Sequence, residues 1–281
     1  MGIMIIGASG YIGKSLYTLA KKLSVACGTS TTGTNNLIPL RLEAPDKFDY
    51  GFVQDSDTVL VAAAISAPDI CSREHDRAWT VNVTGTSSFI SRVIAKNARV
   101  IFFSSDTVYG EKADELDETA ACYPLGDYAV MKHEIENRFI GNPGFKSIRL
   151  SYVFSTEDKF TKYLCGCAAK GEDAEIFHPF YRSVIHRDDV VQGAVSLAQR
   201  WDEFPQNVIN FGGPDVISRI EFTEALRNTA LSTLRFRQIQ PEPAFFANRP
   251  RVIRMKSPLL ASLLGRPARS LHEAAQLEFD Q

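Results

Sequence analysis

The 281-residue sequence contains no uninterrupted apolar run of the ~18 residues that a membrane-spanning helix requires, so we expect no membrane segment. The apolar stretch at residues 3–6 is too short for the core of a secretion signal and follows no basic leader. The net charge is −2, with acidic and basic residues mixed along the chain. This balance argues against nucleic acid or a membrane surface as a partner.

Cysteine is scarce and is not arranged for metal binding or redox chemistry. The five cysteines are an odd number, and Cys165 and Cys167 are separated by one residue rather than by the two of a C-x-x-C pair. We therefore expect reduced thiols, no bound metal and a cytoplasmic location. Low-complexity segments and repeats are also absent, and a hydrophobic content of 44% is typical of a globular protein.

Short apolar runs alternate with helical patterns through the first two thirds of the chain. Strands are predicted near residues 3–7, 24–28, 58–66, 99–105, 147–154 and 207–213. This alternation predicts an α/β fold, a Rossmann-type doubly wound parallel sheet covered on both faces. We assign residues 1–154 to a dinucleotide-binding Rossmann domain. Residues 155–281 are mainly a smaller C-terminal substrate-binding region, with 184–213 returning to the Rossmann core.

The sequence IMIIGASGYIG, residues 3–13, places three glycines directly after the first strand and at the start of a helix. Gly7, Gly10 and Gly13 allow a tight turn and a close approach of the backbone to a pyrophosphate, which then lies at the helix N-terminus. The spacing differs by one position from G-x-G-x-x-G, and a glycine-rich turn alone is weak evidence. Because this turn opens a βαβ unit, we expect it to bind a dinucleotide.

The segment after the second strand lacks the acidic residue that usually binds the adenosine ribose of NAD. It reads CGTSTTGTNN at residues 27–36, and the first acid after it is Glu43. Hydroxyl and amide side chains tolerate a 2′-phosphate, and Arg41 is the nearest basic residue that could reach it. We therefore expect NADP(H) as the preferred cofactor and NAD(H) as the alternative.

The sequence GDYAVMKHEIE, residues 126–136, places Tyr128 and Lys132 one helical turn apart. A phenol titrates near pH ~10, and a neighbouring cation is expected to lower its pKa. The alternative is a packed tyrosine beside a lysine that reaches to solvent. The strand at 99–105 brings Ser105 to its carboxyl end, where ligands bind in such sheets. A hydroxyl, a phenol and a cation together suit the reduction of a carbonyl group.

The glycine motif, the sequence SSDTVYG at residues 104–110 and the Y-x-x-x-K pair together resemble the extended short-chain dehydrogenase/reductase family. The resemblance extends over nearly the whole chain, because it includes the segments WTVNVTGT (79–86), RLSYVF (149–154) and RSVIHRDDV (182–190). Within the family, the chain is most similar to the dTDP-4-dehydrorhamnose reductases and related nucleotide-sugar ketoreductases. These share Asp106 and a late R-P segment, here within 248–265, whereas Arg187 and Arg251 depart from the family pattern.

The resemblance implies that Ser105, Tyr128 and Lys132 are the catalytic triad, with Lys132 also holding the nicotinamide ribose. It implies cofactor contacts from the glycine loop, the ends of the next strands and the catalytic helix: Gly7, Ser9, Gly10, Tyr11, Ile12, Gly13, Thr29, Ser30, Ala62, Ala63, Ala64, Asn82, Tyr128 and Lys132. Substrate contacts are expected from Asp106, Thr107, Arg182 and Arg249. Arg182 is either a bidentate ligand of the substrate pyrophosphate or part of a surface salt bridge.

The function implied by the resemblance is NADPH-dependent reduction of a keto group on a nucleotide-linked deoxysugar, or the reverse oxidation. In the family's sugar dehydratases an Asp-Glu pair follows the catalytic hydroxyl residue, and in GDP-fucose synthases a cysteine takes the second position. This chain has Asp106 and Thr107 there. The alternatives are an epimerase or dehydratase of the same family, or a non-catalytic regulatory subunit that binds the cofactor. A homodimer is expected by analogy with the family.

Two other groups of polar residues have simple structural explanations. Asp188 and Asp189 are better explained by a helix N-terminus, which favours carboxylates, than by a metal site. His178 and His186 are expected to be structural rather than acid–base groups, because His178 lies among aromatic residues in the sequence FHPFYR.

Overall fold

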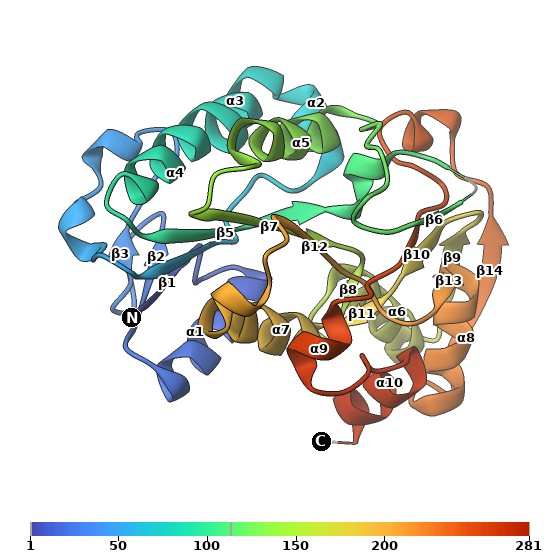
Figure 1. Cartoon of the computed structure of the whole chain (residues 1–281). Helices are drawn as coiled ribbons and strands as arrows, with labels where there is room; N and C mark the ends of the chain where they lie inside the picture. Colours follow the sequence, from blue (N-terminus) through green and yellow to red (C-terminus); the bar gives the residue numbers. More distant parts are fainter. Residues whose placement is uncertain (1, 113, 281) are drawn as a thin grey trace.

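Seven parallel strands form one sheet at the centre of the molecule (Figure 1). In the computed structural model, which describes residues 2–112 and 114–280, the strand order is β12-β7-β5-β4-β1-β2-β3. The strands are β1 (Ile3–Ile6), β2 (Ala26–Ser30), β3 (Ile38–Pro39), β4 (Thr58–Val61), β5 (Arg99–Ser105), β7 (Phe145–Leu150) and β12 (Val208–Phe211). Each adjacent pair is parallel. The predicted Rossmann-type doubly wound sheet is confirmed.

The order of the strands reverses at β1. From β1 the sheet extends through β2 and β3 to one edge, and through β4, β5, β7 and β12 to the other. In doubly wound sheets, the connections on either side of such a reversal leave a crevice outside the carboxyl ends of the strands. The topology therefore predicts a ligand site beyond the carboxyl ends of β1 and β4.

Helices cover both faces of the sheet (Figure 1). One layer contains α1 (Tyr11–Leu23), α7 (Arg187–Gln199) and α9 (Leu260–Leu264), and the other contains α2 (Pro68–Arg73), α3 (His75–Trp79), α4 (Thr86–Ile94) and α5 (Asp127–Phe139). An apolar cluster with Leu16 and Ile148 fills the first space, and one with Val59 and Phe89 fills the second. Burial on both faces explains why the strands read as continuous apolar runs.

The remaining elements gather at one end of the sheet, on the right of Figure 1. They are β6 (Glu115–Leu116), β8 (Val153–Phe154), α6 (Lys159–Lys170), β9 (Asp173–Phe177), β10 (Tyr181–Ser183), β11 (Ile185–His186), β13 (Val216–Ser218), α8 (Arg219–Thr229), β14 (Arg235–Ile239), β15 (Arg254–Met255) and α10 (Leu271–Phe279). Their own apolar cluster includes Leu164, Ile176 and Phe222. Between β11 and β13 the chain returns to the main sheet, where α7 packs against α1 and β12 pairs with β7.

Short helical turns connect the main elements: η1 (Pro45–Lys47), η2 (Tyr50–Phe52), the π-type turn η3 (Thr80–Gly85), η4 (Asp106–Tyr109), η5 (Trp201–Glu203) and η6 (Pro243–Phe246). Local signals explain several helix ends. Asp158 caps α6 by accepting hydrogen bonds from two backbone N–H groups of its first turn, and α6 ends at Gly171, whose φ is +67°. A capping box of Ser218 and Glu221 begins α8.

The helical segment that precedes β5 is longer than α4 alone. Helix α3 leads into η3, which continues directly as α4. Gly85, at the end of η3, lies where a Cβ atom would be 1.6 Å from the carbonyl oxygen of Leu42. The missing side chain allows the segment around Leu42 to pack directly against the helix backbone.

The polar residues at the start of α7 have structural roles. Asp188 and Asp189 lie in the first turn of α7, where the helix dipole favours carboxylates. Asp189 is buried and forms ion pairs with Arg266 and Arg269. His186 is also buried, and its Nε2 atom is 2.9 Å from Oε1 of Glu278 in α10. These contacts attach the C-terminal residues to the Rossmann core.

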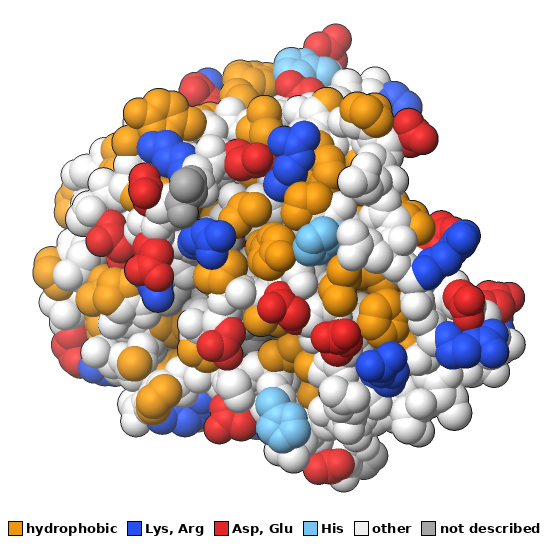
Figure 2. Space-filling model, turned by 90° about the vertical axis from the view of Figure 1, so that its right-hand side faces the viewer, with side chains coloured by type: hydrophobic (Ala, Val, Ile, Leu, Met, Phe, Trp, Pro, Cys, Tyr) orange, Lys and Arg blue, Asp and Glu red, His pale blue; other side chains and the backbone are white. Residues whose placement is uncertain are grey.

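The surface agrees with the balanced composition. On the face shown in Figure 2, acidic and basic side chains are mixed, and hydrophobic side chains lie between them. Among the helices of residues 2–112 and 114–280, none is both long enough and apolar enough to cross a membrane.

Replacing Gly85 with alanine tests the close packing of η3. Gly85→Ala is expected to lower the free energy of unfolding by about 1–3 kcal/mol or more, because the new methyl group overlaps a backbone oxygen. Gly166→Ala is the matched control, since this helical glycine has no heavy atom within 4 Å of where a Cβ atom would lie. The control should gain up to ~1 kcal/mol. Urea unfolding followed by circular dichroism measures both, and equal stabilities would contradict the close contact.

Candidate active site

The glycine loop follows β1 at the carboxyl edge of the sheet. Gly7 has a φ of +85°, and its N–H donates to Oγ1 of Thr29 at 3.2 Å. At Gly13, a Cβ atom would lie 2.0 Å from the carbonyl oxygen of Gly7, so a side chain there would displace the loop. Helix α1 has no side-chain cap and no acid in its first turn. Its free N-terminal N–H groups form an anion site, and this cradle fits the pyrophosphate of a dinucleotide.

A cleft of about 450 Å³ opens beside this loop. Eleven of the predicted cofactor residues line it: Gly7, Ser9, Gly10, Tyr11, Ile12, Gly13, Thr29, Ser30, Ala62, Ala63 and Ala64. Sequence reasoning missed other lining residues, which include Thr31, Leu42, Ser66 and Arg77. Thr31 directly follows the predicted cofactor residue Ser30, and Ser66 lies two residues after Ala64, whereas nothing in the sequence around Arg77 indicates that it lines the cleft.

Asn82, another predicted cofactor residue, supports the wall of the cleft. It is 5% exposed. The Oδ1 atom of Asn82 accepts a hydrogen bond of 2.9 Å from the N–H of Ile65, and its Nδ2 atom donates one of 2.9 Å to the carbonyl oxygen of Ile65. Asn82 is not among the residues that line the cleft, and its contact with the cofactor stays a prediction. A buried amide satisfies both backbone groups of Ile65, and this holds the segment at 62–66 in the cleft wall.

Ser105 ends β5 and begins η4. Its Oγ atom accepts hydrogen bonds from the N–H of Thr107 at 3.2 Å and from Oγ1 of Thr107 at 2.9 Å. It also lies 3.3 Å from Oδ1 of Asp106, to which it can donate. The same hydroxyl therefore caps the turn and lies at the carboxyl end of the strand.

Tyr128 and Lys132 lie on α5, which packs against β5 and η4. The Nζ atom of Lys132 donates to the carbonyl oxygen of Phe103 at 2.6 Å and is 5.7 Å from the centroid of the Tyr128 ring. Phe103 lies two residues before Ser105 on the same strand. The lysine thus joins the helix that carries the phenol to the strand that carries the hydroxyl.

The charges at these two residues differ from the sequence prediction. Burial raises the pKa of Tyr128, and the nearby Cys71 and Asp106 raise it further. Burial also lowers the pKa of Lys132 to about 8. The shift of the phenol pKa is upward, opposite to the direction that the sequence predicted from a cation one helical turn away, because burial disfavours the phenolate while the Lys132 ammonium group is directed to the Phe103 carbonyl. At neutral pH the phenol therefore keeps its proton.

Two predicted substrate residues form a buried ion pair behind Ser105. Asp106 is 4% exposed, accepts a hydrogen bond from Ser151 at 2.9 Å, and has Oδ2 3.6 Å from Nε of Arg182. Burial raises the pKa of Asp106 although Arg182 opposes this shift. The terminal nitrogens of Arg182 donate to the carbonyl oxygens of Tyr181 at 2.6 Å and Pro250 at 2.7 Å. The guanidinium of Arg182 is therefore committed to contacts within the protein.

The other predicted substrate residues lie in different settings. Arg249 donates to Oδ2 of Asp69 at 2.6 Å and to the carbonyl oxygen of Phe245 at 3.1 Å, and the first contact lowers the pKa of Asp69. Thr107 is partly exposed beside Ser105. Asp106 and Arg182 thus lie together behind Ser105, Thr107 contacts Ser105, and Arg249 joins the C-terminal region to α2.

Three potential metal ligands, Cys122, His133 and Glu136, have ligand atoms within 4.8 Å of one another. The Glu136 carboxylate already accepts hydrogen bonds from Arg149 at 2.7 Å and from Ser147 at 2.9 Å. A guanidinium beside this carboxylate repels a divalent cation. We interpret the group as a buried ion pair that attaches α5 to β7.

Solved structures with this fold include sugar-nucleotide enzymes. A hypothetical dTDP-4-dehydrorhamnose reductase from Sulfolobus tokodaii is similar with a TM-score of 0.84 and 19% identity, covering 96% of this chain and 98% of that chain. A UDP-glucuronic acid 4-epimerase variant from Bacillus cereus, in complex with NAD and a fluorinated UDP-sugar, is similar with a TM-score of 0.82 and 20% identity, covering 100% of this chain and 98% of that chain.

A known sequence relative is methionine adenosyltransferase 2 subunit beta from Xenopus laevis. It is 23% identical over 262 residues, which are 88% of this chain and 78% of the relative. The sequence model of one family, described as RmlD substrate binding domain, matches residues 1–281. Since this match spans the whole chain, the protein belongs to the RmlD substrate binding domain family.

Proposed function

We propose that this protein catalyses the NAD(P)H-dependent reduction of a keto group on a nucleotide-linked deoxysugar. The observation that carries the proposal is the bond from Lys132 to the carbonyl oxygen of Phe103, which joins the helix of Tyr128 to the strand that ends at Ser105. Membership of the RmlD substrate binding domain family and the dTDP-4-dehydrorhamnose reductase of similar fold support the substrate class.

In this mechanism Ser105 donates a hydrogen bond to the keto oxygen and orients the carbonyl. Tyr128 donates its phenolic proton to that oxygen as charge develops on it, and its raised pKa keeps this proton available at neutral pH. Lys132 in its cationic form stabilises the phenolate that remains. The nicotinamide cofactor supplies the hydride when it is bound. The glycine loop and residues 62–66 would hold that cofactor.

Thr107 favours reduction over elimination of water. Dehydration needs a base that removes the proton next to the leaving hydroxyl, and a threonine hydroxyl is far too weakly basic for this step. The Thr107 hydroxyl also donates a hydrogen bond to Oγ of Ser105, so its side chain supports the group that orients the carbonyl. An epimerase or dehydratase is therefore the weaker alternative.

A non-catalytic, cofactor-binding subunit is the second candidate. It is favoured by the relative from Xenopus laevis, whose name describes a subunit of methionine adenosyltransferase. A protein that only binds cofactor has no need of a protonated phenol beside a strand-end serine, so we rank this candidate second.

Location and assembly are further parts of the proposal. All five cysteines have free thiols among the residues that the structure describes, which suits the reducing cytoplasm. A homodimer remains a prediction from the family resemblance.

The reductase proposal predicts stoichiometric NADPH oxidation with a 4-keto-6-deoxy nucleotide sugar, followed at 340 nm. Tyr128→Phe keeps the ring but removes the proton donor, so turnover should fall by at least ~10²-fold while cofactor binding survives. In a second reaction, dTDP-glucose with NAD should yield no keto sugar. Formation of the keto sugar there, without NADPH oxidation in the first reaction, would identify a dehydratase. Cofactor binding without any turnover would favour the subunit.

The charge of Lys132 predicts a pH limit. Since the pKa of Lys132 is lowered to about 8, the cation is present below that pH and is lost above it. We expect kcat/KM to fall as the pH rises through about 8. Lys132→Arg, which keeps its charge, should lack this fall, and Lys132→Met should be slow at every pH and bind the cofactor weakly. A fall near pH 8 that persists in Lys132→Arg would assign it to another group.

The preference for NADP(H) stays a prediction, and the cleft contains features that oppose each other. The lining residues Thr29, Ser30 and Thr31 carry no charge, but Glu43 lies in the same cleft while Arg41 is not among its lining residues. A carboxylate repels a 2′-phosphate, so Glu43→Gln should tighten NADPH binding by about 3- to 10-fold with little effect on NADH.

Fluorescence titration of both reduced cofactors measures this preference. Asp46→Asn is the matched control, because Asp46 is an exposed acid in η1 that does not line the cleft. Tighter binding of NADH than NADPH by the wild-type protein would show that the Glu43 carboxylate has a larger effect on cofactor preference than the uncharged residues 29–31. Equal NADPH affinities of the wild type and Glu43→Gln would show that Glu43 does not affect NADPH binding.

A further inference from the structure

Tyr11 is the first residue of α1 and lines the cofactor cleft beside the glycine loop. The first N–H groups of a helix have no partner within the helix, so the backbone of Tyr11 belongs to the anion site that fits the cofactor pyrophosphate. Its phenol oxygen is 2.7 Å from Oγ of Ser155, a buried residue that directly follows β8. The start of α1 is therefore joined by a side-chain hydrogen bond to the C-terminal part of the chain.

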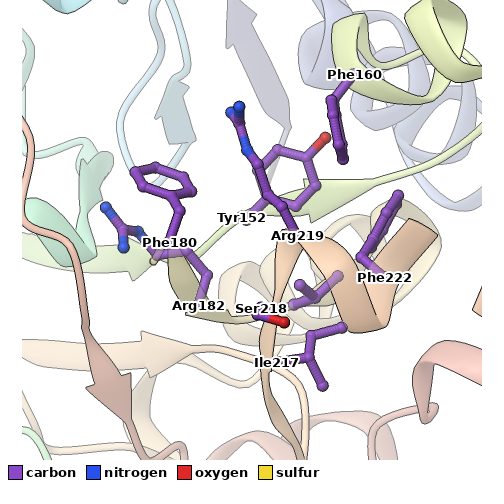
Figure 3. Close-up of a pocket in the computed structure, with 9 residues that line it drawn as sticks. Tyr152, Phe160, Phe180, Arg182, Ile217, Ser218, Arg219 and Phe222 are labelled. Atoms are coloured by element: carbon purple, nitrogen blue, oxygen red, sulfur yellow. The ribbon is translucent and has the colours of Figure 1, made fainter. Parts of the chain in front are cut away.

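Ser155 begins a turn that side chains fix in place. Its Oγ atom accepts a hydrogen bond from the N–H of Glu157 at 3.1 Å, which closes the turn around Thr156. Its own N–H donates to Oδ2 of Asp158 at 3.2 Å, and Asp158 also accepts a hydrogen bond from the hydroxyl of Tyr152 (Figure 3). The position of the turn thus sets the position of the hydroxyl that contacts the phenol at the start of α1.

The middle of this turn is bound by Glu278, near the end of α10. Oε2 of Glu278 accepts hydrogen bonds from the N–H of Thr156 at 2.8 Å and from its hydroxyl at 2.6 Å. Oε1 is 2.9 Å from Nε2 of His186 in β11, the strand that pairs with β8. Although burial opposes ionisation, the hydrogen bonds from His186 and Thr156 lower the pKa of Glu278 to about 2. At neutral pH it is therefore a carboxylate with both oxygens in use.

Arg187, which departs from the family pattern, contacts three parts of this network. Its guanidinium carbon is 5.7 Å from the centroid of the Tyr11 ring, and it forms an ion pair with Glu157. One of its terminal nitrogens is 3.9 Å from Oε1 of Glu278. The side chain is 15% exposed, so solvent screens these contacts only weakly. The arginine thus packs the phenol ring, the turn and the carboxylate of α10 against one another.

We infer that Glu278 is a positioning residue for the cofactor, which acts by fixing Tyr11 at the start of α1; this inference rests on the cofactor binding in the proposed function and not on its chemistry. Glu278 is not among the residues that line the cleft, so it acts through Thr156 and Ser155. Loss of the carboxylate leaves the N–H of Thr156 without its acceptor, and the turn shifts to find another. The Ser155 hydroxyl moves with the turn, and the first N–H groups of α1 lose their fixed position.

Fluorescence titration with NADPH and NADH tests the inference without any turnover. Glu278→Gln keeps the shape of the side chain, but an amide has a single acceptor oxygen and cannot serve both Thr156 and His186. Both cofactors should bind about 3- to 10-fold more weakly, the loss expected for about one hydrogen bond. The two losses should be equal, because the pyrophosphate is common to both cofactors. With the keto sugar, KM for NADPH should rise by the same factor and kcat should stay within about 3-fold.

A double-mutant cycle tests whether Glu278 acts through Tyr11. Tyr11→Phe removes the phenol hydroxyl and should weaken both cofactors by a similar factor. The double variant Tyr11→Phe/Glu278→Gln should bind them no more weakly than the weaker single variant, because both changes break the same connection. Losses that multiply in the double variant would overturn the inference.

Thr156 offers a milder test of the same contact. Thr156→Val removes only the hydroxyl that donates to Glu278 and keeps the backbone N–H, so both cofactors should bind about 2- to 5-fold more weakly. Thr156→Ser keeps the hydroxyl and should bind them as the wild type does. Equal affinities of Thr156→Val and Thr156→Ser would contradict the inference.

Glu273→Ala is the matched control for a merely structural role of α10. Glu273 lies on the same helix and forms the capping box with Ser270, so its loss weakens α10 without changing the contact with Thr156. Urea unfolding should show a lower free energy of unfolding for Glu273→Ala and for Glu278→Gln, but only Glu278→Gln should bind the cofactors more weakly.

The outcomes separate this inference from the reductase proposal. Equal cofactor affinity of the wild type and Glu278→Gln, or equal losses in both glutamate variants, would overturn the inference even if the protein oxidises NADPH. Weaker cofactor binding by Glu278→Gln in a protein that never oxidises NADPH would retain the inference and reject the reductase.

Discussion

The buried ammonium group of Lys132 is the contact on which the geometry of the proposed catalytic site depends. A cation that is 4% exposed needs a partner, and its partner is the carbonyl oxygen of Phe103 at 2.6 Å. Because Phe103 and Ser105 share β5, this one bond sets the distance between the strand-end hydroxyl and the helix that carries Tyr128. The same burial lowers the pKa of Lys132 to about 8, so position and charge have a common cause.

Paired charges likewise join the C-terminal region to the Rossmann part of the chain. Arg182 pairs with Asp106, and Arg249 pairs with Asp69 of α2. In both pairs the arginine belongs to the C-terminal region and the acid to the Rossmann part. These ion pairs hold the walls of the site together and use the donors that the sequence suggested for a ligand. The guanidinium of Arg219 instead packs against the rings of Phe160 and Phe180.

The fold was largely predictable because its signals are local. Apolar runs of strand length, helical periodicity and the glycine turn after β1 each depend on neighbouring residues, and the predicted strands differ from the observed ones by only a few residues. Eleven predicted cofactor residues line one cleft for the same reason, since they follow the carboxyl ends of adjacent parallel strands. The sequence could not show that the buried amide of Asn82 bonds the backbone of Ile65, because this contact joins residues 17 positions apart.

The sequence by itself determined the doubly wound sheet, the glycine loop and the presence of a serine, a tyrosine and a lysine at spacings that suit carbonyl reduction. Only the tertiary structure decided the electrostatics of these residues. Burial raises the pKa of Tyr128 where the sequence predicted that a lysine one turn away would lower it. The tertiary structure likewise decided which arginine is paired: Arg182 forms an ion pair with Asp106, whereas Arg219 packs against two phenylalanine rings. Desolvation and pairing depend on residues that are distant in the chain and become neighbours only when the sheet and the C-terminal region pack together.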